Sequence, residues 1–273
     1  MSKNVLITGG NSGIGKEMAR ALAAQGDRVI IASRDVSKSQ AAADEIKSVN
    51  GDAQIEAMAL ELSDFAAIDN FAEQLLERMP VIDVLILNSG LYTNGLRTLD
   101  NGFEAMIGIM HFGHFRLTQK LQAAVVAAEQ GRIIVTSSMA HKIGTIKQAS
   151  FTDPSKHRLA LAGYAQAKLA NLLFTRELAR RLEDTNVTVN AFHPGAVATG
   201  IWRELPGPIR KVIMMFLVTS EQGADTAVWL ANSPEAAQLN GEYLIKRKVV
   251  SSSPESRDKK QAEWLWDYSE KKM

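Results

Sequence analysis

Two residues four positions apart, Tyr164 and Lys168, form the pair in this sequence best suited to proton transfer. Residues with this spacing share one face of a helix, so the phenol and the ammonium can point into the same space. A free phenol has a pKa of about 10, and a neighbouring cation favours the phenolate and lowers that pKa. We therefore expect general acid–base chemistry at Tyr164. The alternative is an ordinary surface pair on an exposed helix. The surrounding sequence has to distinguish a catalytic pair from a surface pair.

A hydroxyl group is expected beside this pair. Ser137 and Ser138 directly follow the aliphatic run 133–136, which has the character of a buried strand. Ligands of open α/β sheets bind at the carboxyl ends of the strands, where Ser138 would then lie. Ser138 is therefore our candidate for binding the oxygen of a substrate.

A glycine-rich turn, Thr8 to Gly15, separates the first aliphatic run from a helical stretch. Its glycines, Gly9, Gly13 and Gly15, would permit a tight turn and close approach of a pyrophosphate to the backbone. The helix that follows offers free N–H groups and the positive end of its dipole. A plain strand-to-helix turn is the alternative, but three glycines at such a junction favour a dinucleotide site.

The residues after the second aliphatic run indicate which dinucleotide is bound. An acidic residue at this place would hydrogen-bond the ribose 2′-hydroxyl of NAD, whereas this run ends in Ser33 and Arg34. A guanidinium can pair with a 2′-phosphate through two charge-assisted hydrogen bonds. We therefore expect NADP(H), although Arg34 could instead be an ordinary solvated arginine and Asp35 follows it.

The order of the elements predicts the fold. Seven short apolar runs alternate with amphipathic helical stretches, and the helices are expected at 15–25, 65–79, 103–129 and 164–182. Strand–helix alternation of this kind implies right-handed crossovers and a parallel sheet with helices on both faces. We expect one α/β domain over residues 1–273, a doubly wound Rossmann-type sheet of about seven strands. The runs begin at residues 5, 29, 55, 84, 133, 187 and 243.

Composition excludes several classes of protein. The formal net charge is +1 and gives no electrostatic reason to expect a nucleic acid partner. The absence of cysteine excludes disulfides and thiolate chemistry. The apolar stretch 212–218 is too short to cross a bilayer, and residues 1–7 do not read as a signal peptide. We expect a cytoplasmic protein without an integral membrane segment. His111 and His114 share a helical face but lack a convincing third ligand, so no metal site is expected.

Together these motifs resemble the short-chain dehydrogenase/reductase family over nearly the whole chain. Residues 8–15 fit its T-G-x-x-x-G-I-G motif, residues 88–90 fit most of its N-N-A-G motif, and residues 193–195 contain its P-G turn. Ser138, Tyr164 and Lys168 fit its catalytic set. The stretches 168–171, 174–182 and 187–195 are most similar to the retinol-dehydrogenase-like branch.

The resemblance implies a role for each of these residues. Tyr164 would exchange the proton with the substrate oxygen, Ser138 would orient that oxygen, and Lys168 would lower the pKa of Tyr164 and hold the nicotinamide ribose. Thr199 would bind the carboxamide and Leu62 would contact adenine, although Glu61 replaces the usual aspartate. The expected NADP(H)-binding residues are Gly9, Asn11, Ser12, Gly13, Ile14, Gly15, Ser33, Arg34, Leu62, Asn88, Gly90, Tyr164, Lys168, Pro194, Gly195, Val197 and Thr199.

The same resemblance implies two further segments and an assembly. Residues 202–219 would form an apolar, methionine-rich lid over a lipophilic carbonyl or alcohol substrate, although core packing or a subunit contact would explain the same composition. His141, close after Ser138, could line the substrate pocket or simply pack in the interior. Residues 251–273 would be a C-terminal extension that ends in a docked helix. Family members associate through their long helices, which implies a homodimer or homotetramer.

One departure from the family pattern concerns the proton relay. The family usually has an asparagine on the long central helix, where this sequence has Met110, and a methionine side chain cannot replace that polar group. Slow turnover or a different relay is the resulting hypothesis. The alternative function is an NADP(H)-binding sensor or scaffold with little turnover. Light-driven protochlorophyllide reduction is disfavoured because the resemblance would then include an active-site cysteine.

Overall fold

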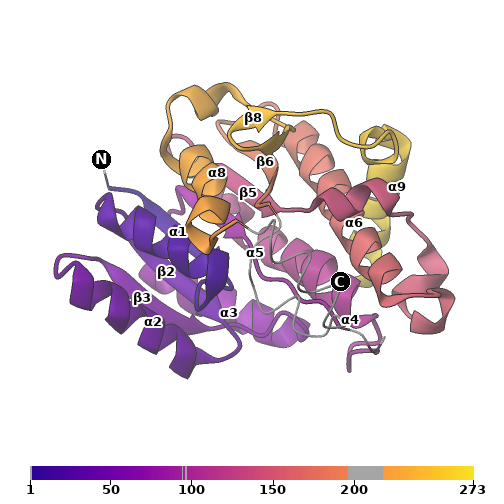
Figure 1. The fold of residues 1–273 in the computed structure, drawn as a ribbon, viewed down its shortest axis with the longest axis horizontal. Coiled ribbons are helices and arrows are strands. Elements are labelled where there is room, and N and C mark those ends of the chain that lie inside the picture. Colours follow the sequence, from indigo (N-terminus) through magenta and orange to yellow (C-terminus); the bar gives the residue numbers. More distant parts are fainter. Residues whose placement is uncertain (1, 94, 96, 196–217) are drawn as a thin grey trace.

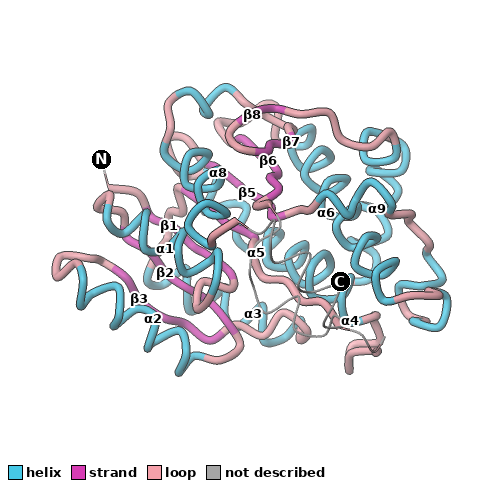
Figure 2. The backbone as a smooth tube through the Cα atoms, viewed as in Figure 1, coloured by secondary structure: helices cyan, strands magenta, loops and turns pink. Residues whose placement is uncertain are grey.

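The computed structural model describes residues 2–93, 95, 97–195 and 218–273. Its centre is one sheet with the strand order β3-β2-β1-β4-β5-β6-β7-β8 (Figures 1 and 2). The strands from β3 to β7 are parallel, and β8 adds to β7 in the antiparallel direction. The strands are β1 (Asn4–Thr8), β2 (Arg28–Ser33), β3 (Ile55–Ala59), β4 (Val84–Leu87), β5 (Arg132–Thr136), β6 (Thr188–His193), β7 (Tyr243–Ile245) and β8 (Lys248–Val249).

Helices cover both faces of this sheet (Figure 1). One face buries the apolar sides of α1 (Gly13–Ala24), α2 (Val36–Val49) and α8 (Ser220–Asn232). The opposite face is covered by α3 (Phe65–Arg78), α5 (His114–Val126) and α6 (Ala160–Arg181). Because both faces are covered, central strands such as β4 are apolar at every position. The doubly wound α/β class expected from the sequence is confirmed.

The long central helix is interrupted where the sequence predicted one continuous helix over 103–129. A short helix α4 (Ala105–Ile107) leads into a π-helical segment (Gly108–Gly113), which then continues as α5. Close packing accompanies this irregularity, since a Cβ added at Gly113 would lie 2.3 Å from the carbonyl oxygen of Leu62. π-Helical turns inside α-helices often mark functional sites.

The C-terminal residues fold back onto the same layer as α9 (Lys259–Lys272), which lies beside α6 in Figure 1. Trp266 packs edge-on against Phe115 of α5 at 4.8 Å and stacks on Phe174 of α6 at 6.0 Å. Ser269 of α9 hydrogen-bonds His111 at 3.0 Å. The chain's own last helix therefore covers part of the surface of α5 and α6.

Two details of the sheet differ from the prediction. Among the described residues the sheet has eight strands, because the antiparallel β8 follows β7 through a turn in which Lys246 and Arg247 have positive φ angles. Strand β6 extends to His193, well past the run expected at 187–189. No helix in the described part of the chain is long and apolar enough to cross a membrane.

Candidate active site

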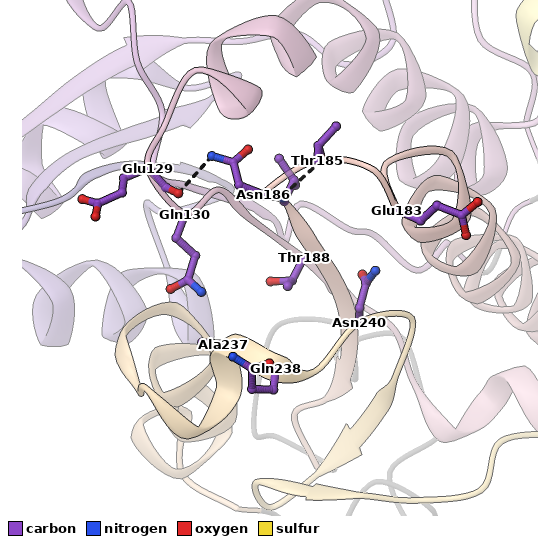
Figure 3. Close-up of a pocket in the computed structure, with 10 residues that line it drawn as sticks. Glu129, Gln130, Glu183, Thr185, Asn186, Thr188, Ala237, Gln238 and Asn240 are labelled. Atoms are coloured by element: carbon purple, nitrogen blue, oxygen red, sulfur yellow. Dashed lines mark hydrogen bonds between the residues drawn. The ribbon is translucent and has the colours of Figure 1, made fainter.

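The carboxyl ends of the parallel strands bring the candidate residues to one edge of the sheet. Thr8 ends β1 beside Ala32 of β2, and Thr136 ends β5 beside Phe192 of β6. The glycine turn, Ser33, Asn88 and Ser138 directly follow these strand ends. A polar hollow lined by Asn186 and Thr188 lies at the opposite, amino end of β5 and β6, away from all candidate side chains (Figure 3).

The glycine turn has a shape that side chains would obstruct. Gly9 and Gly13 have φ angles of +69° and +53°, which favour glycine. A Cβ at Gly15 would lie 2.2 Å from the carbonyl oxygen of Gly9. The N-cap of α1, Ser12, makes no side-chain capping hydrogen bond, and the first turn of α1 carries no acidic residue. The N–H groups of this turn are thus available to an anion.

A buried hydroxyl beneath the turn joins β1 to the loop after β4. The Thr8 Oγ1 accepts hydrogen bonds from the backbone N–H groups of Asn88 (2.9 Å) and Ser89 (3.0 Å). Because these bonds use both of its lone pairs, the hydroxyl can only donate further, and His114 Nε2 at 2.9 Å is a nearer acceptor than the Ile86 carbonyl oxygen at 3.4 Å. His114 then carries its own proton on Nδ1, which donates to the Met110 carbonyl at 3.1 Å. No motif in the amino-acid sequence predicted this role of His114.

Asn88 supports the glycine turn through its side chain. Its amide nitrogen donates to the carbonyl oxygens of Thr8 (3.1 Å) and Gly9 (3.4 Å), and its oxygen accepts from the Thr136 hydroxyl at 3.4 Å. Gly90 is exposed and lies on the side where Met110 and Lys168 gather. A Cβ at Gly90 would lie 3.3 Å from Met110 Sδ and 3.7 Å from Lys168 Nζ.

The second strand places Arg34 at the surface and turns Ser33 inward. Ser33 Oγ hydrogen-bonds Ser39 Oγ at 2.7 Å, so this hydroxyl is engaged within the protein. Arg34 is 76% exposed, with only a 4.0 Å contact to Glu61. It lines a surface hollow with Leu60 and Glu61 at the end of β3. The guanidinium is thus available to a phosphate, and the weak Glu61 contact is its only described ion pair.

The catalytic candidates come together on α6 and at the end of β5. The Ser138 hydroxyl lies close enough to the Tyr164 phenol to lower its pKa. The Lys168 Nζ lies 5.6 Å from the centre of the Tyr164 ring and donates to the Thr136 carbonyl at 3.1 Å. Ser137 in turn donates to the Lys168 carbonyl at 2.9 Å, which ties the helix to the strand end. The structure therefore gathers the three side chains that the sequence singled out.

Burial dominates the acid–base properties of this group. It raises the pKa of Tyr164 to about 12, against the hydrogen bond from Ser138, which lowers that pKa. Burial also lowers the pKa of Lys168 to about 8. We expected Lys168 to lower the pKa of Tyr164, but the net shift has the opposite sign because the buried phenolate loses its hydration. In this structure Tyr164 is a neutral phenol at neutral pH, a proton donor.

Met110 occupies the relay position in the π-helical segment. Met110 is 1% exposed, and its thioether and the Lys168 ammonium both border the position that a Cβ at Gly90 would occupy. One lone pair of its carbonyl accepts the His114 proton. Since the pKa of His114 is lowered to about 3 by burial, this ring stays neutral. The site therefore has a thioether where the family has a polar side chain.

The structure describes some of the remaining residues that we expected at the cofactor and in the lid, and others lie outside the described part of the chain. Leu62 is 4% exposed and belongs to the core, so its side chain offers almost no surface to an adenine. Pro194 and Gly195 follow β6, and Gly195 has a φ angle of +89°. Val197 and Thr199, as well as lid residues 202–217, lie outside the described residues. Thr219 forms a capping box at the start of α8 with Gln222.

Three histidines near the site, His111, His114 and His141, make hydrogen bonds within the protein. His111 Nε2 bonds Ser269 and His114 Nε2 bonds Thr8. Over the described ranges, no three His, Asp or Glu side chains are grouped so that they could hold a metal ion. His141 is fully buried, and its Nδ1 lies 2.6 Å from the Ser138 carbonyl oxygen. The sequence was compatible with two places for His141, in the lining of the pocket or in the interior. Its complete burial shows that it packs in the interior.

The described residues fit a dinucleotide. A Cβ at Gly15 would collide with the Gly9 carbonyl oxygen, so the turn is shaped for glycine, and the helix behind it begins without a side-chain cap. Arg34, with its exposed cation, stands at the end of β2, where the adenosine ribose of such ligands lies. Tyr164, Ser138 and Lys168 stand at the end of β5, farther along the same edge.

Comparison with known proteins places the chain among dehydrogenases. A family model described as short chain dehydrogenase matches residues 3–208. The chain is 40% identical to retinol dehydrogenase 12 of Mus musculus over 269 residues, covering 98% of this chain and 85% of that protein. It is 36% identical to retinol dehydrogenase 14 of Homo sapiens over 287 residues, with the same coverage of both chains.

Solved structures agree with this placement. A protein from Mycobacterium paratuberculosis, described as uncharacterized, superposes with a TM-score of 0.82 at 32% identity, over 99% of this chain and 92% of its own. A 3-ketoacyl-(acyl-carrier-protein) reductase from Brucella melitensis, solved as a complex with NADH, gives a TM-score of 0.71 at 25% identity. That match covers 89% of this chain and 95% of the reductase.

Proposed function

The chain belongs to the short-chain dehydrogenase family, and from this premise we propose that it is an NADP(H)-dependent oxidoreductase that interconverts a carbonyl and an alcohol on a lipophilic small molecule. The observation that carries this proposal is the convergence of Ser138, Tyr164 and Lys168 at the edge of the sheet that also bears the glycine turn. Ser138 is far from Tyr164 and Lys168 in sequence, and the glycine turn is farther still, but the fold brings them to one edge of the sheet, where they could act on the same substrate.

The side chains divide the chemistry among themselves. Ser138 would hydrogen-bond the substrate oxygen, and Tyr164 would donate its proton to that oxygen in reduction or remove it in oxidation. Lys168, held by Thr136, would supply positive charge beside the phenolate formed in reduction and bind ribose hydroxyls. The nicotinamide, when bound, supplies or accepts the hydride. The turn at Gly9 to Gly15 would hold the pyrophosphate.

The choice of NADP(H) over NAD(H) depends on the surface at the end of β2. Arg34 is exposed there and no carboxylate stands at Ser33, which favours a 2′-phosphate over a bare 2′-hydroxyl. Lys38, on the first turn of α2, adds a second exposed cation 2.9 Å from Asp35. The weak Glu61 contact does not neutralise Arg34, because the atoms are 4.0 Å apart and solvated.

A lipophilic substrate is supported by exposed apolar side chains close in sequence to Ser138 and Tyr164. Met139 directly follows Ser138 and is 49% exposed, and Ile143, five residues after Ser138, is 66% exposed. Leu159 and Leu161, shortly before Tyr164, are 68% and 44% exposed. Large exposed apolar side chains can contribute to a binding surface. The curated relatives named retinol dehydrogenases point to the same class, a long apolar alcohol or aldehyde.

The proposal is tested by assaying the protein with NADPH against aldehydes and ketones of increasing chain length. We expect oxidation of NADPH with the apolar members, and at least a 100-fold loss of kcat in Tyr164→Phe with cofactor affinity within about twofold of the original. Full activity in Tyr164→Phe would refute the mechanism. NADPH binding without turnover on any substrate would instead favour a sensor or scaffold. Met110 and Ser89 depart from the family motifs and are the reason for considering that function.

A further inference from the structure

We propose that His141 is a positioning residue for Ser138, and that the segment Ser252–Ser256 holds His141 in the protonation state that this role requires. The proposal rests on the proposed function for the role of Ser138 at the substrate oxygen. It assigns a part in the active site to a C-terminal segment more than a hundred residues from Ser138 in sequence, and no sequence motif predicted that part.

The protonation state of His141 follows from its neighbours. The backbone N–H of Ser253 donates a hydrogen bond to His141 Nε2 at 3.2 Å, so Nε2 must present its lone pair. A neutral imidazole then carries its proton on Nδ1. Nδ1 lies 2.6 Å from the Ser138 carbonyl oxygen, to which it donates. If Nε2 carried the proton instead, its N–H would face the N–H of Ser253, and the Nδ1 lone pair would face the lone pairs of the Ser138 carbonyl oxygen.

The bond to the Ser138 carbonyl fixes the peptide that carries the catalytic hydroxyl. Ser138 is the N-cap of the 3-10 helix Met139–Ile143, and its Oγ accepts from the Ala140 N–H at 3.2 Å. Its carbonyl accepts from the backbone N–H of His141 at 3.1 Å as well as from the imidazole. These bonds orient the peptide and the side chain of Ser138 together, which directs the remaining capacity of the hydroxyl toward Tyr164 and the substrate.

The segment Ser252–Ser256 is anchored to the helix that carries Tyr164 and Lys168. Arg176, on α6, donates to the Ser252 hydroxyl at 2.9 Å and to the Ser256 hydroxyl at 3.0 Å, and it also binds the Ser256 carbonyl. Ser256 Oγ donates to the Ser253 carbonyl at 2.7 Å. A single helix therefore sets the positions of the proton donor and, through Arg176, of the segment that orients His141.

The environment of His141 excludes solvent as an alternative partner. The residue is fully buried, and Ser252, Ser253 and Ser256 are 5%, 7% and 0% exposed. The ring of Tyr243 packs edge-on against the imidazole, with ring centres 5.0 Å apart. Both nitrogens of His141 are therefore committed to protein groups, and neither is free to act as an acid or base on a substrate.

Two near-isosteric substitutions separate the two ends of the ring. His141→Asn places an amide N–H near the position of Nδ1 and keeps the donor to Ser138, whereas His141→Gln reaches the position of Nε2 and loses that donor. We expect His141→Gln to lower kcat by about 10- to 100-fold. His141→Asn should stay within about threefold, and both variants should keep the KM for NADPH. Equal kcat losses that follow thermal stability would reduce His141 to a packing residue and overturn the proposal.

The tautomer itself can be read by NMR without any activity. In protein labelled with ¹⁵N-histidine, long-range ¹H–¹⁵N correlations should show His141 protonated on Nδ1 alone. Arg176→Lys removes the guanidinium fork and should yield a mixture of tautomers and a lower kcat, whereas Arg180→Lys, a matched change on the exposed side of α6, should alter neither. An Nε2-protonated ring in the unmodified protein would refute the proposal. A correct tautomer in a protein without oxidoreductase activity would instead refute the proposed function.

Discussion

Lys168 is charged at a cost to the folded state, so its replacement by methionine should stabilise the protein while abolishing its activity. The side chain is 3% exposed, and burial lowers its pKa from 10.5 to about 8. Because the pKa is lower in the folded chain than in the unfolded chain, the ammonium form is disfavoured by folding. At pH 7 the difference corresponds to about 3 kcal/mol of lost stability.

The structure also shows what Lys168→Met would lose. The hydrogen bond to the Thr136 carbonyl disappears, which costs about 1 kcal/mol. That carbonyl is not left unpaired, because the Asn171 side chain also donates to it at 3.0 Å. Methionine fills a similar volume. The net gain should be about 2 kcal/mol at pH 7, or about 3 to 4 °C in Tm for a chain of this length.

The dependence of this gain on pH gives the sharper test. The unfolded chain keeps the Lys168 proton up to a pH near 10.5 and the folded chain only to about 8, so the unfolded state binds more protons in that window. The original protein's stability, compared with that of the variant, therefore rises with pH through this range. At pH 7 the free energy of unfolding should be about 2 kcal/mol larger for Lys168→Met, and this difference should shrink as the pH rises. At high pH its sign should reverse slightly, because the hydrogen bond to Thr136 is then the only contribution of Lys168 that the variant lacks.

Urea unfolding of both proteins, without added cofactor, at several pH values from about 7 to 10.5 measures this difference. Lys142→Met removes the same charge from an exposed lysine close to the site and should change stability little at any pH. Activity should fall by at least about 100-fold in Lys168→Met only. A destabilised Lys168→Met protein, or a stability difference that stays constant with pH, would show that burial does not disfavour this ammonium.

Three further substitutions test other parts of the site. Thr8→Val leaves the N–H groups of Asn88 and Ser89 without their acceptor and should destabilise the protein by about 3 kcal/mol in urea unfolding, whereas Thr8→Ser keeps the hydroxyl and should cost about 1 kcal/mol or less; equal losses would contradict the hydrogen-bonding argument. Met110→Asn should raise kcat about fivefold, the worth of one hydrogen bond in the transition state, and an unchanged rate under conditions where chemistry is limiting would refute a limiting relay. Arg34→Gln should weaken NADPH binding by about 10-fold and leave NADH binding nearly unchanged, as measured by fluorescence titration, and a parallel loss for both cofactors would remove Arg34 from the recognition of the 2′-phosphate.

The local elements of this protein were largely readable from the chain. Apolar runs such as 84–87 and 133–136 predicted strands close to where they occur, and the helix carrying Tyr164 and Lys168 was expected over 164–182 and found over 160–181. The reason is that strands buried on both faces must be apolar at each position, and that a turn followed by a helix start needs glycine. Both constraints act on neighbours in sequence.

The boundaries that failed are those set by distant contacts. The helix expected over 103–129 is interrupted by a π-helical segment, where Gly113 packs against the backbone of Leu62. The extra strand β8 depends on pairing with β7 and on a turn with positive φ angles at Lys246 and Arg247. Neither feature has a periodic signal, because tertiary contacts decide the local geometry in both.

For the site itself, the amino-acid sequence determined which groups are present: a phenol, an amine and a hydroxyl at known places on a helix and at the end of a strand. Only the tertiary structure decided their acid–base state, since the depth of burial makes Tyr164 a weaker acid and Lys168 a weaker base. It also decided the partners of His114 and His141, which lie on Thr8 and on Ser253. The physical reason is that desolvation and hydrogen-bond direction depend on every atom packed around a group, whatever its position in the chain.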